Sequence, residues 1–231
     1  MKYLTIIPAR KGSKRIKDKN IKLLQSKPLI YYTINSALKS NLGKSPVIVS
    51  TDSRKIAKLS EEYGAEVPFF RSEELATDYA SSVGLVLECL DYYKKKGIEF
   101  ESIVLLQPTS PLRSVSDINE AVKKYQQFNL NALVSVTEVQ EHPELMYKIK
   151  KEFLEELNIQ KEACFKRSQD MSKLYRINGA IYIVKVQDFL KEKSFILEDT
   201  GYYIMPYERS IDIDEPVDFK IAEFFLKEKR K

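Results

Sequence analysis

The chain lacks several residue types on which common catalytic and structural sites depend. Its 231 residues contain no Trp, a single His (His142) and two Cys (Cys89 and Cys164). Two distant cysteines provide neither a disulfide framework nor a zinc motif. One histidine leaves little for a His-rich metal site, and a Ser-His-Asp triad would have to use that residue. Seven glycines are too few for a collagen-like or glycine-rich chain.

Long apolar runs and a strong excess of one charge are also missing. No stretch approaches the roughly 18 apolar residues of a membrane span, and the apolar run before Pro8 is too short for a signal peptide. The net charge of +5 permits an anionic ligand without requiring nucleic acid. We therefore expect a soluble, cytoplasmic protein with neither a membrane nor a nucleic-acid partner. Because 43% of the residues are hydrophobic, a disordered chain is excluded, and the length favours one domain, residues 1–231.

Short β-branched apolar runs alternate with amphipathic stretches along the chain. The runs have the nearly continuous apolar character of buried parallel strands and cover residues 3–8, 46–51, 102–107, 132–137 and 180–184. The amphipathic stretches have helical stripes over 30–38, 83–90, 117–128 (a helix beginning at Ser116) and 217–225 (after Pro216). Strands that alternate with helices predict a doubly wound α/β sheet.

The segment 138–175 interrupts this alternation. It is polar, charged, weakly periodic and too long for an ordinary loop. Two interpretations compete: a disordered insertion, or an arm that packs on something else. The large apolar side chains of the segment favour an arm or a subunit contact; they are Met146, Tyr147, Ile149, Phe153, Leu154, Leu157 and Phe165.

A basic loop, residues 9–20, follows the first predicted strand directly. Ligands of open α/β sheets bind beyond the carboxyl ends of the strands, and backbone N–H groups around Gly12 and Ser13 can form a nest for phosphate oxygens. The loop also carries cations that suit a triphosphate: Arg10, Lys14, Arg15 and Lys19. The Walker and G-x-G-x-x-G patterns are both absent, so neither an ordinary P-loop nor a dinucleotide site is indicated. The alternative is a solvated basic loop or a weak nucleic-acid patch.

A pair of carboxylates lies near the end of the chain in the segment SIDIDEP, residues 210–216. Alternation puts Asp212 and Asp214 on one face of an extended segment, with their Cα atoms about 6.6 Å apart. Two such carboxylates repel unless a cation lies between them, and Mg²⁺ prefers carboxylate together with substrate phosphate oxygens. Alternatively, or in addition, Asp214 caps a helix. A phosphate-binding loop and a carboxylate pair on one sheet together indicate nucleotidyl transfer.

Four more segments place polar groups at strand ends or helix starts on the same rim. With the first loop and the acidic pair, they form a series of pieces over residues 6–214: IPARKGSKRIKDKN, STDS, RSEELATDYASS, LLQPTSPLR, YRINGAIYI and SIDID. In these pieces and in their order, the chain resembles the acylneuraminate cytidylyltransferase family, the CMP-sialic acid synthetases. The related synthetases for the sugar Kdo usually carry Ser-Thr-Arg in the first loop, so GSKR favours the nonulosonate branch.

The resemblance implies a reaction and an architecture. The reaction is Mg²⁺-dependent transfer of CMP from CTP to the anomeric hydroxyl of a nine-carbon nonulosonic acid, giving CMP-sugar and pyrophosphate. The sugar is N-acetylneuraminic, legionaminic or pseudaminic acid. The architecture is a mostly parallel, Rossmann-like sheet of the nucleotide-diphospho-sugar transferase type. In it, residues 138–175 form a small dimerisation arm that reaches the partner's active site in a homodimer. Alternatives are a cytidylyltransferase for another keto-acid sugar such as Kdo, and a non-catalytic nucleotide-binding protein.

Roles carry over from the resemblance residue by residue. The catalytic residues implied are Arg10, Lys19 and Asp214. The nucleotide-binding residues implied are Ala9, Arg10, Gly12, Ser13, Lys19, Asn20, Arg71, Ser81 and Ser82. The sugar-binding residues implied are Gln107, Arg176 and Asn178, and the metal ligands are Asp212 and Asp214.

Each of these assignments has a simpler alternative. Arg71 could form a surface ion pair, Gln107 could satisfy only neighbouring backbone, and Arg176 could lie in a dimer interface. Asn178 and Gly179 could serve first as a turn.

The sequence also departs from the family pattern at two positions. Ser168 and Ser172 stand where the family often has Arg and Pro. No basic contact is therefore assigned to this segment, and the choice among the nonulosonic acids stays open.

Overall fold

A six-stranded sheet forms the centre of the protein. The computed structural model describes residues 2–13, 15–72, 82–157 and 172–228. The strand order is β10-β6-β9-β5-β1-β4. The described strands of this sheet are β1 (Tyr3–Pro8), β4 (Val47–Ser50), β5 (Ser102–Leu105), β6 (Ala132–Glu138), β9 (Tyr175–Lys185) and β10 (Gly201–Ile204). All of them run parallel except β9, which is antiparallel to both of its neighbours, β5 and β6.

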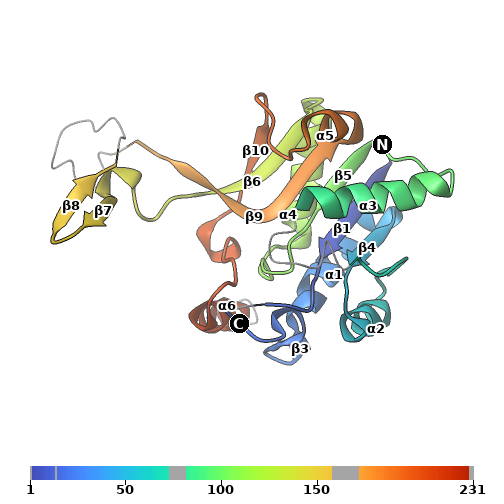
Figure 1. Ribbon diagram of the computed structural model, residues 1–231, viewed down its shortest axis with the longest axis horizontal. Helices are drawn as coiled ribbons and strands as arrows, with labels where there is room; N and C mark the ends of the chain where they lie inside the picture. Colours follow the sequence, from blue (N-terminus) through green and yellow to red (C-terminus); the bar gives the residue numbers. More distant parts are fainter. Residues whose placement is uncertain (1, 14, 73–81, 158–171, 229–231) are drawn as a thin grey trace.

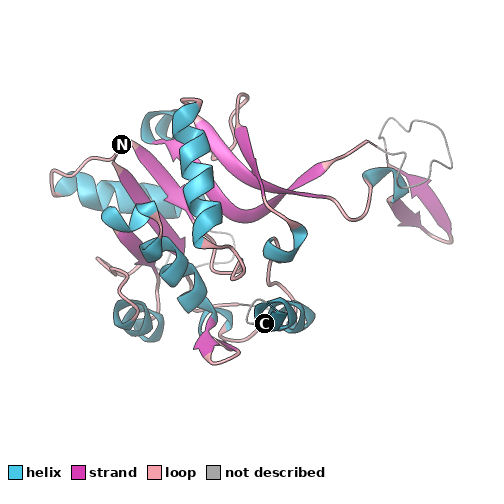
Figure 2. Cartoon of the chain, turned by 180° about the vertical axis from the view of Figure 1, so that it is seen from behind, coloured by secondary structure: helices cyan, strands magenta, loops and turns pink. Residues whose placement is uncertain are grey.

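Helices cover both faces of the sheet (Figures 1 and 2). The helices are α1 (Leu29–Lys39), α2 (Arg54–Glu62), α3 (Ser82–Lys95), α4 (Val115–Gln127), α5 (Val186–Glu192) and α6 (Pro216–Glu228). Buried side chains of α1 and α4 form one apolar cluster with the sheet, and those of α3 and α5 form a second cluster. The predicted doubly wound, mostly parallel α/β sheet is confirmed.

A third apolar cluster lies under α6 and positions the functional loops. It joins Ile16 of the first loop to Ile211 and Ile213, which flank Asp212, and to Phe219 of α6. Burial of these isoleucines fixes the backbone on both sides of the aspartates. A short hairpin of β2 (Leu23–Leu24) and β3 (Lys27–Pro28) connects the first loop to α1.

The structure confirms the five predicted strands and the four predicted helices, with two corrections. The direction expected for 180–184 was wrong, because this segment belongs to the antiparallel strand β9. Ile183 packs in one cluster and Val184 in the other, so both faces are buried and the run resembles a parallel strand. The helix expected from Ser116 begins at Val115, with Ser114 as its N-cap.

Several elements carry too weak a pattern to be predicted. The edge strand β10 is four residues long and only partly buried, and α2 is predominantly polar and buries only Ile56, Ala57 and Ser60. Short or largely solvated elements lack the periodic apolar stripe on which prediction depends.

The segment 138–175 contains a projecting hairpin. β6 and β9 pair as far as Glu138 and Tyr175, and beyond them β7 (Tyr147–Lys150) and β8 (Phe153–Glu156) form a separate two-stranded sheet. Figure 1 shows this hairpin far from the central sheet. All eight of its residues are exposed. Residues 139–157 are therefore a folded projection, whereas 158–171 lie outside the described residues. Within the part of the chain that the structure describes, no helix combines the length and apolarity needed to cross a bilayer.

A buried carboxylate ties α4 to the chain that leads into the acidic pair. Asp117 completes a capping box with Ser114 and accepts hydrogen bonds from Arg209 Nε (2.8 Å) and Nη2 (2.9 Å). Tyr203 OH donates a further bond to Asp117 Oδ1 (3.2 Å). Burial alone would raise the pKa of Asp117, but the hydrogen bonds from Arg209 and Ser114 outweigh it and lower that pKa. The ionised carboxylate therefore stabilises the folded state.

We expect Asp117→Asn to lower the free energy of unfolding by about 2–3 kcal/mol at pH 7, since it removes the charge of a buried hydrogen-bonded pair. Because the pKa of Asp117 is lower in the folded than in the unfolded state, its carboxylate stabilises the fold above about pH 4. This stabilisation is lost as the pH falls through the folded-state pKa. Urea unfolding at pH 7 and pH 3 should thus show a difference between variant and wild type that shrinks at pH 3. Glu120→Gln, an exposed position on the same helix, is the control. An equal difference at both pH values would contradict the assignment.

Candidate active site

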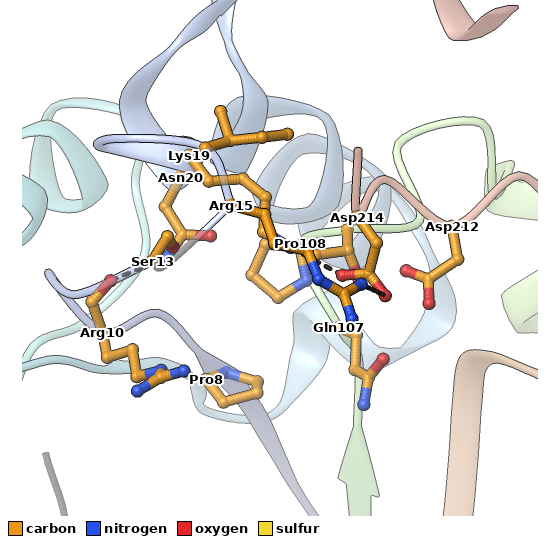
Figure 3. A pocket seen from close by; sticks show the side chains of 12 residues that line it. Pro8, Arg10, Ser13, Arg15, Lys19, Asn20, Gln107, Pro108, Asp212 and Asp214 are labelled. Atoms are coloured by element: carbon orange, nitrogen blue, oxygen red, sulfur yellow. Dashed lines mark hydrogen bonds and ion pairs between the residues drawn. The ribbon is translucent and has the colours of Figure 1, made fainter. Parts of the chain in front are cut away.

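A cavity of about 630 Å³ opens at the carboxyl ends of β1 and β5 (Figure 3). From β1 the chain passes first to β4 on one side and then to β5 on the other, so the cavity lies where open α/β sheets bind ligands. Its lining residues come from three distant segments: Pro8, Arg10, Ser13, Arg15, Ile16, Lys19, Asn20, Gln107, Pro108, Thr109, Asp212 and Asp214. The structure thus brings together the basic loop, the end of β5 and the acidic pair.

Hydrogen bonds within the first loop and to the chain at the end of β4 shape this loop. The buried Asn20 donates from Nδ2 to the Arg10 carbonyl (2.9 Å), and Ala9 N donates to the Ser50 carbonyl (2.9 Å). At its exposed part, Lys11 N donates to Asp52 Oδ1 (2.7 Å). An added Cβ at Gly12 would meet nothing within 4 Å, so the backbone there has open space beside it. Asn20 holds the loop together, and Arg10 and Ser13 line the cavity.

Cations of the first loop contact the acidic pair directly. Lys19 Nζ donates to the Ile213 carbonyl (2.8 Å) and to Asp214 Oδ1 (3.0 Å). Arg15 Nη1 lies 3.7 Å from Asp214 Oδ2, so both carboxylate oxygens of Asp214 face a cation. The expected capping of α6 by the Asp214 side chain is not seen. Instead, Asp218 Oδ2 accepts hydrogen bonds from the backbone N–H groups of residues 214 and 215. The contact of the Asp214 side chain is therefore with the first loop.

Asp212 has the features of a cation ligand. Its Oδ1 is buried and has no hydrogen-bond partner in the described structure. Burial raises the pKa of Asp212, as does the charge of Asp214, against the opposing effects of a hydrogen bond from Thr109 and the charges of Lys19 and Arg176. Across the described residues, no three His, Cys, Asp or Glu side chains could together hold a metal ion. The pair fits a cation that takes its other ligands from a bound molecule or water.

The end of β5 brings Gln107 against β9 and the acidic pair. Gly179 has φ +76°, and an added Cβ would lie 2.8 Å from Gln107 Oε1 and 3.9 Å from Asp212 Oδ2. Thr109 accepts a hydrogen bond at its carbonyl oxygen from Ile213 N (2.8 Å). Sequence reasoning assigned no site role to Thr109 or Gly179. Both lie inside the quoted motifs, but only the fold shows what they touch.

The other predicted residues that the structure describes are not among the lining of the cavity. Arg71 is 7% exposed and donates from Nε to Ser50 Oγ (3.2 Å) and from Nη2 to the Ser50 carbonyl (2.6 Å), which excludes a surface ion pair. Arg176 is exposed on β9, opposite Thr137. Ser82 is the first residue of α3 and is exposed, and Ser81 lies outside the described residues.

Asn178 is buried within a polar network. Its Oδ1 accepts from Ser135 Oγ (2.6 Å) and Ala180 N (3.1 Å), and its Nδ2 donates to Ser210 Oγ (2.9 Å). These bonds join β6, β9 and the segment that precedes Asp212. The Asn178 side chain therefore supports the chain around the site, and contact with a sugar stays a prediction.

Comparison with known protein families identifies the chain. A family described as Cytidylyltransferase matches residues 4–229. The chain belongs to this family. It is a nucleotidyltransferase of the acylneuraminate cytidylyltransferase type.

Similar cytidylyltransferases come from several bacteria. The CMP-N,N'-diacetyllegionaminic acid synthase of Legionella pneumophila is 37% identical over 96% of this chain and 95% of that protein. The N-acylneuraminate cytidylyltransferase of Escherichia coli O18:K1:H7 is 39% identical over 96% of this chain and 51% of that protein, so this chain spans about half its length. The pseudaminic acid cytidylyltransferase of Campylobacter jejuni is 33% identical over 98% of this chain and 97% of that protein.

Solved structures of cytidylyltransferases share the fold. A CMP:2-keto-3-deoxy-manno-octonic acid synthetase, solved in complex with CTP, superposes with a TM-score of 0.71 at 16% identity over 99% of this chain and 100% of that one. A 4-diphosphocytidyl-2C-methyl-D-erythritol synthase from Anaerococcus prevotii gives 0.61 at 14% identity, with 98% of each chain covered. These likenesses confirm the architecture.

We expect Gly179→Ala to impair cytidylyl transfer by displacing the Gln107 amide. Gly97 is the matched control, because it has φ +71° and an added Cβ there would meet nothing within 4 Å. Both substitutions should lower the free energy of unfolding by about 1–2 kcal/mol, the cost of a left-handed alanine. Only Gly179→Ala should lower kcat/KM by about tenfold or more. Equal activity of the two variants, measured by pyrophosphate release, would exclude a role for the Gln107–Gly179 contact.

Proposed function

We propose that the enzyme transfers CMP from CTP to the anomeric hydroxyl of a nine-carbon nonulosonic acid and releases pyrophosphate. N-acetylneuraminic, legionaminic and pseudaminic acids are the candidate acceptors, since relatives named for each are 33–39% identical to this chain. The observation that carries the proposal is that the cationic first loop and the two carboxylates line one and the same cavity. Such a cavity suits a triphosphate on one side and a metal-bridged phosphate on the other.

The first loop supplies the proposed triphosphate site. Arg10 and Lys19 bind phosphate oxygens, together with backbone N–H groups near Gly12 and Ser13. Lys19 contacts Asp214 in the structure, so it turns from a carboxylate to a phosphate when the nucleotide enters. Ala9 and Asn20 hold the shape of the loop. Arg71, which bonds to Ser50 at the carboxyl end of β4, serves the cytosine end in this proposal, together with Ser81 and Ser82.

Asp212 and Asp214 are the residues that would hold Mg²⁺. The buried, unpartnered Oδ1 of Asp212 and its proximity to a second carboxylate fit such an ion. When bound, Mg²⁺ would neutralise charge on the phosphate oxygens. The chain supplies the ligands on one side only, so the nucleotide completes the site.

The acceptor sugar lies on the β9 side of the cavity in this proposal. Gln107 contacts the acyl-sugar, and the guanidinium of Arg176 pairs with the sugar carboxylate. The buried Asn178 supports the surrounding backbone through its hydrogen bonds. The anomeric oxygen bonds to the α-phosphorus, the bond from that phosphorus to the bridging oxygen breaks, and pyrophosphate leaves. Asp214 accepts the hydroxyl proton. Holding both reactants in this orientation removes much of the entropic cost of the step.

The projecting hairpin supports a homodimer as the working form. Its most exposed apolar side chains are Ile149, Phe153 and Leu154, at 82%, 75% and 68%. Exposure of such apolar side chains to water is unfavourable in a monomer, whereas contact with a second copy would bury them. The segment 138–175 is accordingly the proposed dimerisation arm of a single domain, residues 1–231. A reducing, cytoplasmic location suits a chain with only two cysteines.

Pyrophosphate release from CTP and Mg²⁺ with a panel of sialic, legionaminic and pseudaminic acids should show turnover with at least one sugar. Asp214→Ala should lose at least about 100-fold in kcat, because it removes a group proposed to act on the phosphates and the proton. Glu215→Gln, at the neighbouring acid, should stay near the wild-type rate. Wild-type turnover by Asp214→Ala would exclude the metal and catalytic assignment.

Other outcomes of the same assay separate the alternatives. Turnover with Kdo alone would replace the nonulosonic acid by another keto-acid sugar. CTP binding without turnover on any sugar would indicate a nucleotide-binding protein. Salt-sensitive binding to oligonucleotides without CTP binding would indicate the basic-loop alternative.

Light scattering should give twice the chain mass for the wild type and a single chain mass for Ile149→Glu/Leu154→Glu, because these cross-strand partners share one face of the hairpin and the double variant places two charges in the proposed interface. Lys148→Glu/Lys150→Glu changes charge on the opposite face of the hairpin without removing apolar surface and should stay dimeric. A monomeric wild type would overturn the dimer proposal.

A further inference from the structure

The loop that leaves β5, residues 107–113, contacts both halves of the cavity. At its start, the Gln107 amide lies against Gly179 of β9. Two residues on, the Thr109 carbonyl accepts a hydrogen bond from Ile213 N (2.8 Å), and the Thr109 side chain lowers the pKa of the neighbouring Asp212 against the effect of burial. The position of this loop therefore sets the separation between the proposed sugar contact and the acidic pair.

A buried guanidinium anchors the other end of the loop. Arg113 is 3% exposed. Its Nη1 donates to the carbonyls of Ala180 (2.7 Å) and Gln107 (3.3 Å), and its Nη2 donates to Thr33 Oγ1 (2.8 Å). Thr33 Oγ1 in turn donates to the Gln107 carbonyl (3.4 Å). One side chain thus joins α1, β9 and the loop itself.

The charge of Arg113 is unusual for a purely structural group. Its described acceptors are carbonyl and hydroxyl oxygens, and the carboxylate that acts on it, Asp117, is bonded to Arg209. Burial lowers the pKa of Arg113 to about 9. A buried charge is costly, and apolar residues of similar volume often stabilise a fold as well or better. Stability therefore gives no reason for a cation at this position.

The surroundings of Arg113 give a reason for its charge. The cation bonds to the carbonyl of Gln107, a residue that lines the cavity proposed to hold a triphosphate and a sugar carboxylate. Its planar fork can hold two carbonyls and a hydroxyl in one fixed arrangement, which a lysine ammonium cannot reproduce.

We propose that Arg113 is a positioning residue for CMP transfer, which fixes Gln107 and the backbone at Gly179 and Ala180 opposite Asp212. The inference rests on the proposed function. It extends that function by assigning the spacing between sugar and metal sites to one buried side chain.

Three variants test the proposal. Arg113→Lys keeps the charge but loses the fork, and Thr33→Val removes one acceptor while leaving the guanidinium in place. Tyr125→Phe is the matched control, since it removes a buried hydrogen bond to Ser102 (2.9 Å) at the amino end of β5, away from the cavity. For each, kcat, KM for the sugar, the dissociation constant of CTP and the urea midpoint are measured.

We expect kcat with the nonulosonic acid to fall about fivefold in Thr33→Val and about fiftyfold in Arg113→Lys, because a misplacement near 1 Å is enough for such losses. CTP affinity should change less than about twofold, since the first loop is untouched. Tyr125→Phe should lower the urea midpoint and leave kcat unchanged. Unchanged kcat in Thr33→Val and Arg113→Lys, or an equal loss of CTP affinity, would overturn the proposal.

Crystal structures of wild type and Arg113→Lys provide a readout independent of turnover. The Gln107 amide should leave Gly179 in the variant, and its retention there would overturn the proposal. A wild type inactive on every sugar would instead refute the proposed function, and the crystallographic comparison would still decide whether Arg113 places Gln107.

Discussion

The contact between the first loop and the acidic pair is the interaction on which the rest of the site depends. Lys19 and Asp214 are 195 positions apart, and the Lys19 ammonium bridges Asp214 and the Ile213 carbonyl. Without the cations of the loop, the repulsion between these two neighbouring carboxylates would be uncompensated in the described structure. The same cations suit phosphate oxygens, so one set of charges serves both the unliganded protein and the proposed nucleotide complex.

Apolar packing makes that contact possible. Ile16, Ile211 and Ile213 share a cluster under α6, which holds the two segments at a fixed separation. The aspartates alternate with these isoleucines, so burial of one face presents the other face to the cavity. Hydrophobic burial holds the first loop and the acidic segment together, and the charged side chains determine what the cavity can bind.

Buried polar groups then define the geometry that apolar packing alone would leave loose. Asp117, Asn178 and Arg113 each join at least two elements around the cavity, through Arg209, Ser210 and Ala180 respectively. Each group must be satisfied once buried, so its hydrogen bonds exclude alternative arrangements of the backbone. In contrast, the hairpin of β7 and β8 projects beyond the paired ends of β6 and β9 and forms a sheet of its own. Its exposed apolar side chains point to a partner rather than to the core of its own chain.

Local features of the sequence by themselves determined most strands and helices and the chemistry of the first loop. Periodicity over a few residues predicts β1 and α4, and the alternation of SIDID predicts which side chains share a face, because these patterns are local. Tertiary structure alone decided the direction of β9, since burial of both its faces erases the difference between parallel and antiparallel strands. It also decided that Asp218 caps α6, that Asn178 is enclosed, and that Thr109, Gly179 and Arg113 meet around Gln107. Contacts between residues tens of positions apart depend on how the sheet is ordered, and no local pattern encodes that order.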